Sequence, residues 1–249
     1  AASAAVGAGN FTYNNQTGEM NSLGKTATVM QMIFPEYSID ISNLGGIKAN
    51  SISMVGNTFG LGVRNKGTVT ANTALAMTSF GSLINEGSIN TNGLMAKMAS
   101  LGDMKNTGTI NSTAYITQVS SVGTLTNEGT IASSKQIAIS ATGDLVNAGT
   151  MKGTQLLSVA SGGNLTTRKG SNTVSDGQLA VSANNIDNAG SMRGNITYVA
   201  FSGDKLKVTG ELRGHSTLTV QSKKDDKVNS GLIYNTGSIS GNDVTIITN

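Results

Sequence analysis

The sequence predicts an all-β protein that folds as a right-handed parallel β-helix of about ten coils. A five-residue pattern, Asn-x-Gly-Ser/Thr-apolar, returns with a period of 20 or 21 residues. Short segments in which apolar and polar residues alternate accompany each copy at fixed offsets. Alternation with a period of two is typical of strands, and a fixed period of this length is typical of solenoids. Nothing in the repeats shows the apolar spacing of a helix.

The pattern defines ten units along the chain. Successive intact copies are separated by 20, 21, 21, 20, 41 and 47 residues. The gap of 41 contains a degenerate copy near residues 167–170, and the gap of 47 contains another at 208–212 that is followed by an insertion. A related segment at 43–47 precedes them all. The intact copies begin at Asn65, Asn85, Asn106, Asn127, Asn147, Asn188 and Asn235.

Each unit holds three segments of strand length. An apolar residue stands two positions before each Asn, as Leu83 and Leu125 do, and an alternating segment such as 136–140 lies midway between turns. A single coil of three short strands cannot bury its inward side chains, whereas stacked coils build a continuous core and satisfy one another's backbone hydrogen bonds. At about 4.8 Å per coil, ten coils give a rod of roughly 45 to 50 Å.

The Asn-x-Gly turn is the candidate structural site. Asn and Gly tolerate positive φ, and the Asn carboxamide can bond its own turn, so the pair suits the corner of a coil. Asn at the same place in successive coils can also form an amide ladder. The alternative, hairpin turns of an antiparallel sheet, fits the constant spacing less well. The predicted turn ladder comprises Asn65, Gly67, Asn85, Gly87, Asn106, Gly108, Asn127, Gly129, Asn147 and Gly149.

The ends of the chain depart from the repeat. Residues 1–42 lack it and contain the only Pro, Pro35, so we expect an N-terminal capping or transition segment there, followed by the β-helix over 43–249 with an insertion near 222–230. The strand pattern of Val244–Ile247 has no visible cap, and the first residues, which do not begin with Met, lack the features of a signal peptide. We therefore expect a piece of a longer protein.

Composition excludes several classes of function. The chain has 249 residues, no Cys, one His, 12% charged residues and a net charge of +3. Disulfides, thiolate metal sites and cysteine nucleophiles are excluded, and one His cannot supply a His-rich metal centre, so we expect no metal and no cofactor. The weak basic balance and the 4% aromatic content give no case for nucleic acid. No apolar stretch is long enough to insert into a membrane.

Residues 39–52 and 61–67 carry a resemblance to a known family. A Leu44-Gly45-Gly46 segment followed by Gly62-Val63-Arg64-Asn65-Lys66-Gly67 resembles the point where filamentous haemagglutinin-like exoproteins of two-partner secretion systems pass from secretion domain to haemagglutinin repeats. The later Asn-x-Gly units are similar to those repeats, so the resemblance covers about residues 39–249. Ile47-Lys48, where relatives often have Met-Tyr, departs from the pattern, and the Asn-Pro-Asn motifs of the secretion domain are absent.

The resemblance implies a non-catalytic filament segment of a large exoprotein that is secreted to the cell surface of a Gram-negative bacterium. Such proteins are exported by an outer-membrane two-partner secretion transporter, which would be the partner of the parent protein. They serve as adhesins, haemolysins or stalks for contact-dependent growth inhibition toxins. The segment would present an adhesive, receptor-binding or toxin region to a host or neighbouring cell.

Two other functions stay open. The chain could itself be an adhesin that binds glycan or host matrix along one face, although Tyr115, Tyr198 and Tyr234 do not form one stripe in the sequence. It could also be a β-helical polysaccharide-degrading enzyme, which needs two carboxylates about 5 to 9.5 Å apart. Asp103 and Asp144 occupy equivalent positions two coils apart, and Glu86 and Glu128 are spaced alike. Nothing apolar surrounds these acids to raise a pKa, so we expect no catalysis.

The remaining candidate residues are interpreted as structural. His215 has no second His, no Cys and no paired acid nearby, so we expect a surface or turn residue. Asp225-Asp226 between lysines falls in the insertion and is expected to form a solvated loop, with a partner contact as the alternative. Most Met residues fall on inward strand positions and are expected to fill the core. They include Met77, Met95, Met98, Met104, Met151 and Met192.

Overall fold

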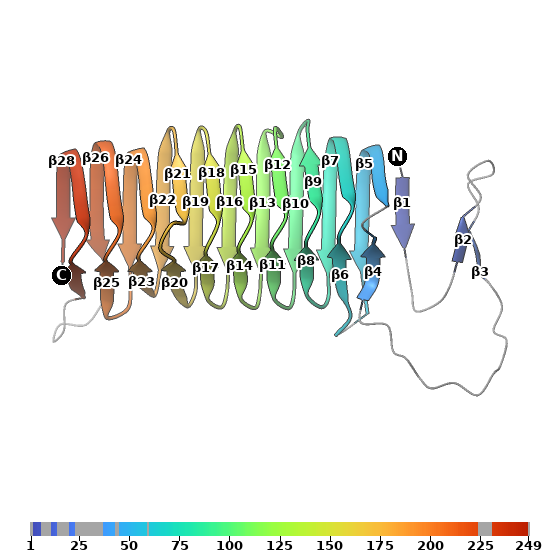
Figure 1. Ribbon diagram of the computed structural model, residues 1–249, viewed down its shortest axis with the longest axis horizontal. Coiled ribbons are helices and arrows are strands. Elements are labelled where there is room, and N and C mark those ends of the chain that lie inside the picture. The colour runs from blue at the N-terminus through green and yellow to red at the C-terminus, as the bar shows by residue number, and fades with distance from the viewer. Residues whose placement is uncertain are drawn as a thin grey trace.

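The computed structural model describes residues 2–5, 11–13, 20–22, 37–42, 45–58, 60–223 and 231–248. Strands and turns account for all of the regular structure in these ranges, and the described residues contain no helix. None of them therefore forms a helix that could cross a bilayer. Parallel strands stack along one axis into a rod (Figure 1). The predicted fold class, an all-β right-handed parallel β-helix, is confirmed.

The first of the two main sheets takes one strand from every coil. It contains ten parallel strands whose order in space is their order in the chain, so each strand pairs with the equivalent strand of the next coil. The strands are β4 (Tyr37–Ile41), β6 (Gly62–Asn65), β8 (Leu83–Asn85), β11 (Met104–Asn106), β14 (Leu125–Asn127), β17 (Leu145–Asn147), β20 (Asn164–Thr167), β23 (Asn185–Asn188), β25 (Lys205–Val208) and β27 (Leu232–Asn235). Stacking in this sheet is therefore regular from β6 to β27, whereas the pairing of β4 with β6 shifts register between Tyr37 and Ile39.

The second main sheet contains sixteen strands and supplies the other two sides of the coil. In the middle of the rod each coil contributes two short strands separated by a corner. The first row comprises β9 (Ser88–Thr91), β12 (Thr109–Ser112), β15 (Thr130–Ser133), β18 (Thr150–Gly153) and β21 (Asn172–Ser175). The second row comprises β10 (Met95–Ser100), β13 (Ile116–Ser121), β16 (Gln136–Ala141), β19 (Leu156–Ser161) and β22 (Gln178–Ala183).

Long strands join the two rows at both ends of the rod. They run through the corner, and their pairing shifts register there, as between Gly194 and Ile196. A further strand, β1 (Ala2–Ala5), pairs in parallel with the first long strand, and β2 (Phe11–Tyr13) pairs antiparallel with β3 (Met20–Ser22). The long strands are β5 (Gly46–Gly56), β7 (Thr68–Ser79), β24 (Ser191–Phe201), β26 (Glu211–Ser222) and β28 (Ser238–Ile247).

The core is a set of apolar stacks that run along the rod axis. Alternation within each strand sends every second side chain inward, and exact register places it on the same position of the next coil; Ile110, Ile131 and Met151 form one such stack and are fully buried. Burial of this kind contributes about 25 cal/mol per Å² of apolar surface. Together the stacks form one continuous hydrophobic core along the rod.

Methionines fill much of this core, with one exception. Met77, Met98, Met104, Met151 and Met192 are at most 1% exposed. The expectation that Met95 also points inward is wrong, because β10 directs Ala96 and Met98 to the core and leaves Met95 50% exposed.

The last coil is not covered by any described residue. Val244 and Ile246 stack on Leu218 and Val220, which are fully buried, yet they are themselves 45% and 49% exposed. At the other end, β4 pairs with β6 from Tyr37 onward. Asn43, Pro35 and Asp225-Asp226 lie outside the described residues.

An ion pair stabilises the first coil. Arg64 donates from Nη2 to Asp40 Oδ2 at 2.6 Å and from Nε to Oδ1 at 3.0 Å, and its guanidinium lies 4.3 Å from the centroid of the Tyr37 ring. The hydrogen bond from Arg64 lowers the pKa of Asp40, against a smaller opposing effect of burial. The folded-state pKa of Asp40 is therefore below its unfolded value.

The stability that the Asp40 carboxylate supplies should depend on pH. Because the folded-state pKa is depressed, this contribution is fully present above the ordinary Asp pKa of about 4 and is lost as pH falls through the folded-state value. We expect wild type to unfold at a higher temperature than Asp40→Asn at neutral pH, and the two midpoints to converge in acid. Thermal unfolding across a pH series measures this, and a gap that stays constant would contradict the assignment.

Candidate functional site

The five predicted asparagines form a continuous hydrogen-bonded ladder at the turn between the two main sheets. The Nδ2 of each of the first four asparagines donates to the Oδ1 of the next Asn, and all five side chains are at most 1% exposed. The donor–acceptor distances are 2.8 Å for Asn65–Asn85, 2.7 Å for Asn85–Asn106, 2.8 Å for Asn106–Asn127 and 2.9 Å for Asn127–Asn147.

The second amide proton of each Asn is also used. Asn106 Nδ2 lies 3.2 Å from the carbonyl oxygen of Gly108 in its own turn and 3.2 Å from that of Thr130 in the next coil. Asn127 Nδ2 likewise lies 3.0 Å from Thr150 O. A buried amide that satisfies its donors in two coils ties those coils together, because any relative shift would leave polar atoms unpaired.

The ladder changes character after the fifth Asn. Asn147 donates to the hydroxyl of Thr173 and to Asn172 O, both at 2.9 Å. In the next coils the equivalent position is taken by Thr167, whose hydroxyl donates to Asn188 Oδ1, and then by Val208. The two degenerate copies of the repeat are therefore the places where the ladder is modified and where it ends.

The turn glycines of successive coils also stack in close contact. Gly67, Gly87, Gly108, Gly129 and Gly149 each lie so near the preceding coil that an added Cβ would be 2.0 or 2.1 Å from the carbonyl oxygen of the preceding turn glycine. That same oxygen accepts an amide hydrogen bond, as Gly87 O does from Thr109 N at 2.9 Å.

The conformational reason expected for these glycines is wrong. Positive φ among the described residues occurs only at Gly60, Gly93 and Gly170, and no non-glycine residue adopts it. The Asn-x-Gly corner thus needs no left-handed backbone. Gly is required there because two backbones approach too closely for any side chain.

The acidic residues considered for catalysis make local contacts that stabilise the corners. Asp103 Oδ1 accepts a hydrogen bond from Thr124 N at 2.8 Å, and Asp144 Oδ1 accepts one from Asn164 N at 2.8 Å. Both side chains are exposed, and each carboxylate bonds the amide of the next coil. Glu86 and Glu128 form exposed ion pairs with Lys66 and Lys105, at 3.4 Å and 3.1 Å. Each of the four acids therefore has a different partner at its own place along the rod.

His215 is exposed, and its Nδ1 lies 3.5 Å from Arg213 Nη2. Within the described part of the chain, no group of three or more His, Cys, Asp or Glu side chains is arranged to hold a metal ion.

The three tyrosines considered for glycan binding lie apart from one another. Tyr115 is 59% exposed at the corner before β13, Tyr234 is 53% exposed in β27, and Tyr198 donates its hydroxyl to Gln221 Oε1 at 2.6 Å.

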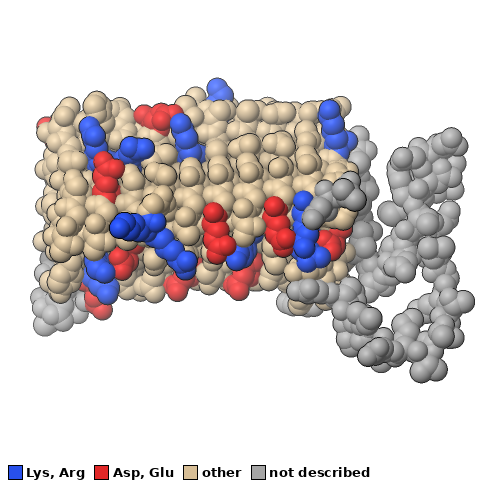
Figure 2. Space-filling model, in the orientation of Figure 1, with Lys and Arg blue, Asp and Glu red and all other residues tan. Residues whose placement is uncertain are grey.

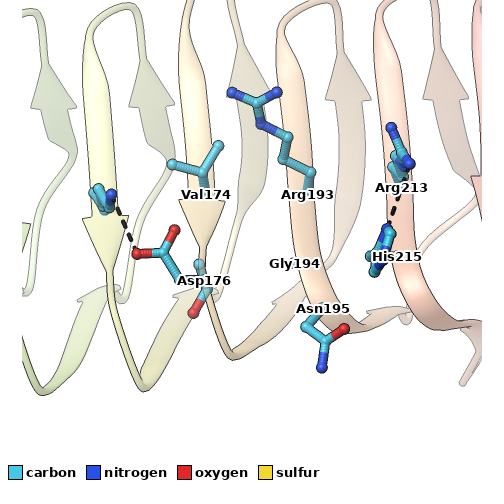
Figure 3. A pocket seen from close by; sticks show the side chains of 9 residues that line it. Val174, Asp176, Arg193, Gly194, Asn195, Arg213 and His215 are labelled. Atoms are coloured by element: carbon cyan, nitrogen blue, oxygen red, sulfur yellow. Dashed lines mark hydrogen bonds and ion pairs between the residues drawn. The ribbon is translucent and has the colours of Figure 1, made fainter.

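Sequence reasoning missed a groove on the outer surface of the second sheet. It has a volume of about 410 Å³ and lies where β21, β24 and β26 pass the corner of the coil (Figure 3). Three cationic side chains line it, and Asp176 is its only acid. We call it the basic groove. Its lining residues are Lys152, Val174, Ser175, Asp176, Arg193, Gly194, Asn195, Arg213 and His215.

A signal for the basic groove is present in the sequence. The three cations occupy an apolar-Lys/Arg-Gly triplet that occurs at 151–153, 192–194 and 212–214, each shortly after a repeat turn. In a coil of known register this triplet places a buried apolar residue, an outward cation and a buried Gly in sequence. Charged side chains are otherwise distributed over the rod as scattered groups (Figure 2).

Comparison of the chain with family models, with curated proteins and with solved structures gave no match. What is established is the fold, a β-solenoid that suits a structural rod or an adhesin-like role.

Proposed function

We propose that this chain is a non-catalytic structural segment of a large secreted bacterial exoprotein, displayed at the surface of a Gram-negative cell. As a rod it holds an adhesive, receptor-binding or toxin region away from the membrane. Export through an outer-membrane two-partner secretion transporter is part of the proposal. It rests on the resemblance of residues 39–67 and of the repeats to haemagglutinin-like exoproteins.

The observation that carries the scaffold role is the continuous parallel pairing of the stack. Every coil from β6 to β25 pairs in parallel with the next one in both main sheets. The ladder from Asn65 to Asn147 adds side-chain hydrogen bonds along the same axis. Bonds that run parallel to the long axis resist bending and stretching, which a spacer requires.

Removal of one coil tests the scaffold role. Deleting residues 128–147 joins Asn127 to Ala148 and recreates an intact Asn-Ala-Gly turn. Because the coils are equivalent, we expect the shortened protein to fold and to remain displayed, one coil shorter. Antibody labelling of intact producing cells measures display, with the full chain as control. Labelling that appears only after permeabilisation would overturn the proposed location.

Direct binding along the rod is the second candidate function. The basic groove favours it, because cations gathered in a concave surface are a feature that a pure spacer does not need. A glycan array probed with the purified chain distinguishes the two roles. A third reading, polysaccharide degradation, would need sugar turnover that is lost in Asp103→Asn or Asp144→Asn.

A further inference from the structure

The basic groove contains an unfavourable pair of like charges. Arg193 of β24 and Arg213 of β26 are directly opposite on neighbouring parallel strands, and both side chains are exposed (Figure 3). Among the described strand residues whose register is defined, this is the only pair of like charges so placed. Like charges directly opposite each other destabilise a sheet. Folding alone therefore gives no reason for this pair.

Other cations on the rod show how the sheet normally accommodates charge. Lys207 stands opposite Asp187 at 3.4 Å, and Arg64 stands opposite Asp40. In the basic groove the one carboxylate, Asp176, is bound to Lys152 at 3.2 Å. Neither Arg193 nor Arg213 has a carboxylate within ion-pair distance among the described residues. The groove thus presents two guanidinium groups to which no described residue supplies a counter-ion.

Neutral polar groups surround the two arginines. The Asn195 side chain accepts a hydrogen bond from Ser216 Oγ at 2.7 Å, which fixes it at the corner, and His215 lies beside Arg213. Ser175, which is 5% exposed, also lines the groove, and its Oγ has no hydrogen-bond partner. The alternation in β21 directs the Ser175 side chain inward like that of Thr173, so its hydroxyl lies beneath the groove and is not among the groups that a ligand contacts.

We propose that the basic groove binds an acidic oligosaccharide of the uronate type along the rod axis. The planar fork of a guanidinium matches a carboxylate with two parallel hydrogen bonds, so Arg193 and Arg213 bind carboxylates on the sugar chain. Asn195 and His215, which are exposed, bond hydroxyl groups. The strand spacing of about 4.8 Å is close to the length of one pyranose ring, which lets successive sugars meet successive coils.

Groove size and composition favour this ligand over other polyanions. A volume of about 410 Å³ lies in the range of small-molecule sites. Single-stranded nucleic acid is usually held by aromatic side chains on which bases stack, and no aromatic residue lines this groove. The inference goes beyond the scaffold role, because the rod keeps its proposed function if the groove binds nothing.

Calorimetric titration of the purified chain with tetragalacturonate tests the proposal. We expect saturable binding that weakens at least about tenfold in Arg193→Gln and in Arg213→Gln, since each loses a charge-assisted hydrogen bond. Arg213→Lys keeps the charge without the fork and should fall between wild type and Arg213→Gln. The matched control is Lys97→Gln, an exposed cation on β10 outside the groove, which should bind as wild type does.

Stability measurements separate loss of binding from loss of folding. Because each Gln variant removes the repulsion between Arg193 and Arg213, its unfolding midpoint without ligand should equal or exceed that of wild type. Absence of tetragalacturonate binding would overturn the proposal. So would equal binding of a fully methyl-esterified tetragalacturonate, inorganic sulfate or single-stranded DNA, which would indicate non-selective attraction of sugars or of anions.

Discussion

Gly108→Ala should destabilise the protein strongly. The new Cβ would lie 2.0 Å from Gly87 O, an atom that accepts an amide hydrogen bond of the stack. The two turns must separate to relieve this contact, and their backbone and Asn hydrogen bonds must lengthen. We expect a loss of about 3 kcal/mol or more in the free energy of unfolding, measured by urea titration.

Two variants show whether close approach is the cause. Thr107→Ala changes the exposed neighbour of Gly108 to the residue already present in the turn at Asn147, so it should change the free energy of unfolding by less than about 0.5 kcal/mol. Gly170→Ala adds a Cβ where no atom lies within 4 Å but φ is +84°, and should cost about 1 to 2 kcal/mol. A larger loss at Gly170 than at Gly108 would contradict the account.

Asn106→Ala should cost about 2 to 5 kcal/mol in the free energy of unfolding. It leaves Asn85 Nδ2 without its acceptor at 2.7 Å and Asn127 Oδ1 without its donor at 2.8 Å. Both atoms belong to fully buried side chains, and each unsatisfied buried polar group costs about 1 to 3 kcal/mol. Chemical unfolding of the two proteins provides the measurement.

A control and a double variant sharpen this test. Asn111→Ala removes an exposed Asn from β12 in the same coil and should change stability by less than about 0.5 kcal/mol. Because Asn106 and Asn127 share one hydrogen bond, the double Ala variant should cost less than the sum of the two single variants. Strict additivity, or a cost at Asn106 as small as at Asn111, would argue against a coupled ladder.

The fold could be predicted from the sequence because every coil repeats the same information. A period of 20 or 21 residues fixes which side chains stack, so the periodicity alone places the apolar residue two positions before each Asn in the core. The exception at Met95 has a local cause. The apolar run 94–96 has no alternation that separates its inward residue from its outward ones, and the structure buries only Ala96.

The turn was harder to predict in detail. The Asn repeat indicated a ladder, but the reason given for Gly was conformational, whereas the structure shows close contact between coils. Backbone approach depends on the shape of the neighbouring turn, which a single sequence does not report. The pairing of Thr167 with Asn188 was equally hidden, because a hydroxyl in place of a carboxamide does not match the repeat pattern.

The basic groove could not be predicted without the register at the corners. Arg193 and Arg213 are 20 residues apart, and so are many pairs in this chain that carry no site. The direct opposition of two arginines distinguishes the groove from an ordinary charged surface. This opposition is created by the pairing of neighbouring coils and follows only from the register of their strands.

The most direct test of the rod is a distance measured across its coils. The chain has no Cys, so Thr107→Cys and Thr209→Cys introduce the only attachment sites for spin labels, on exposed positions of equivalent turns five coils apart. Electron–electron double resonance should give a narrow distribution near about 24 Å, shortened by about 5 Å when residues 128–147 are deleted. A broad distribution, or a distance that the deletion leaves unchanged, would contradict a rigid stack of equivalent coils.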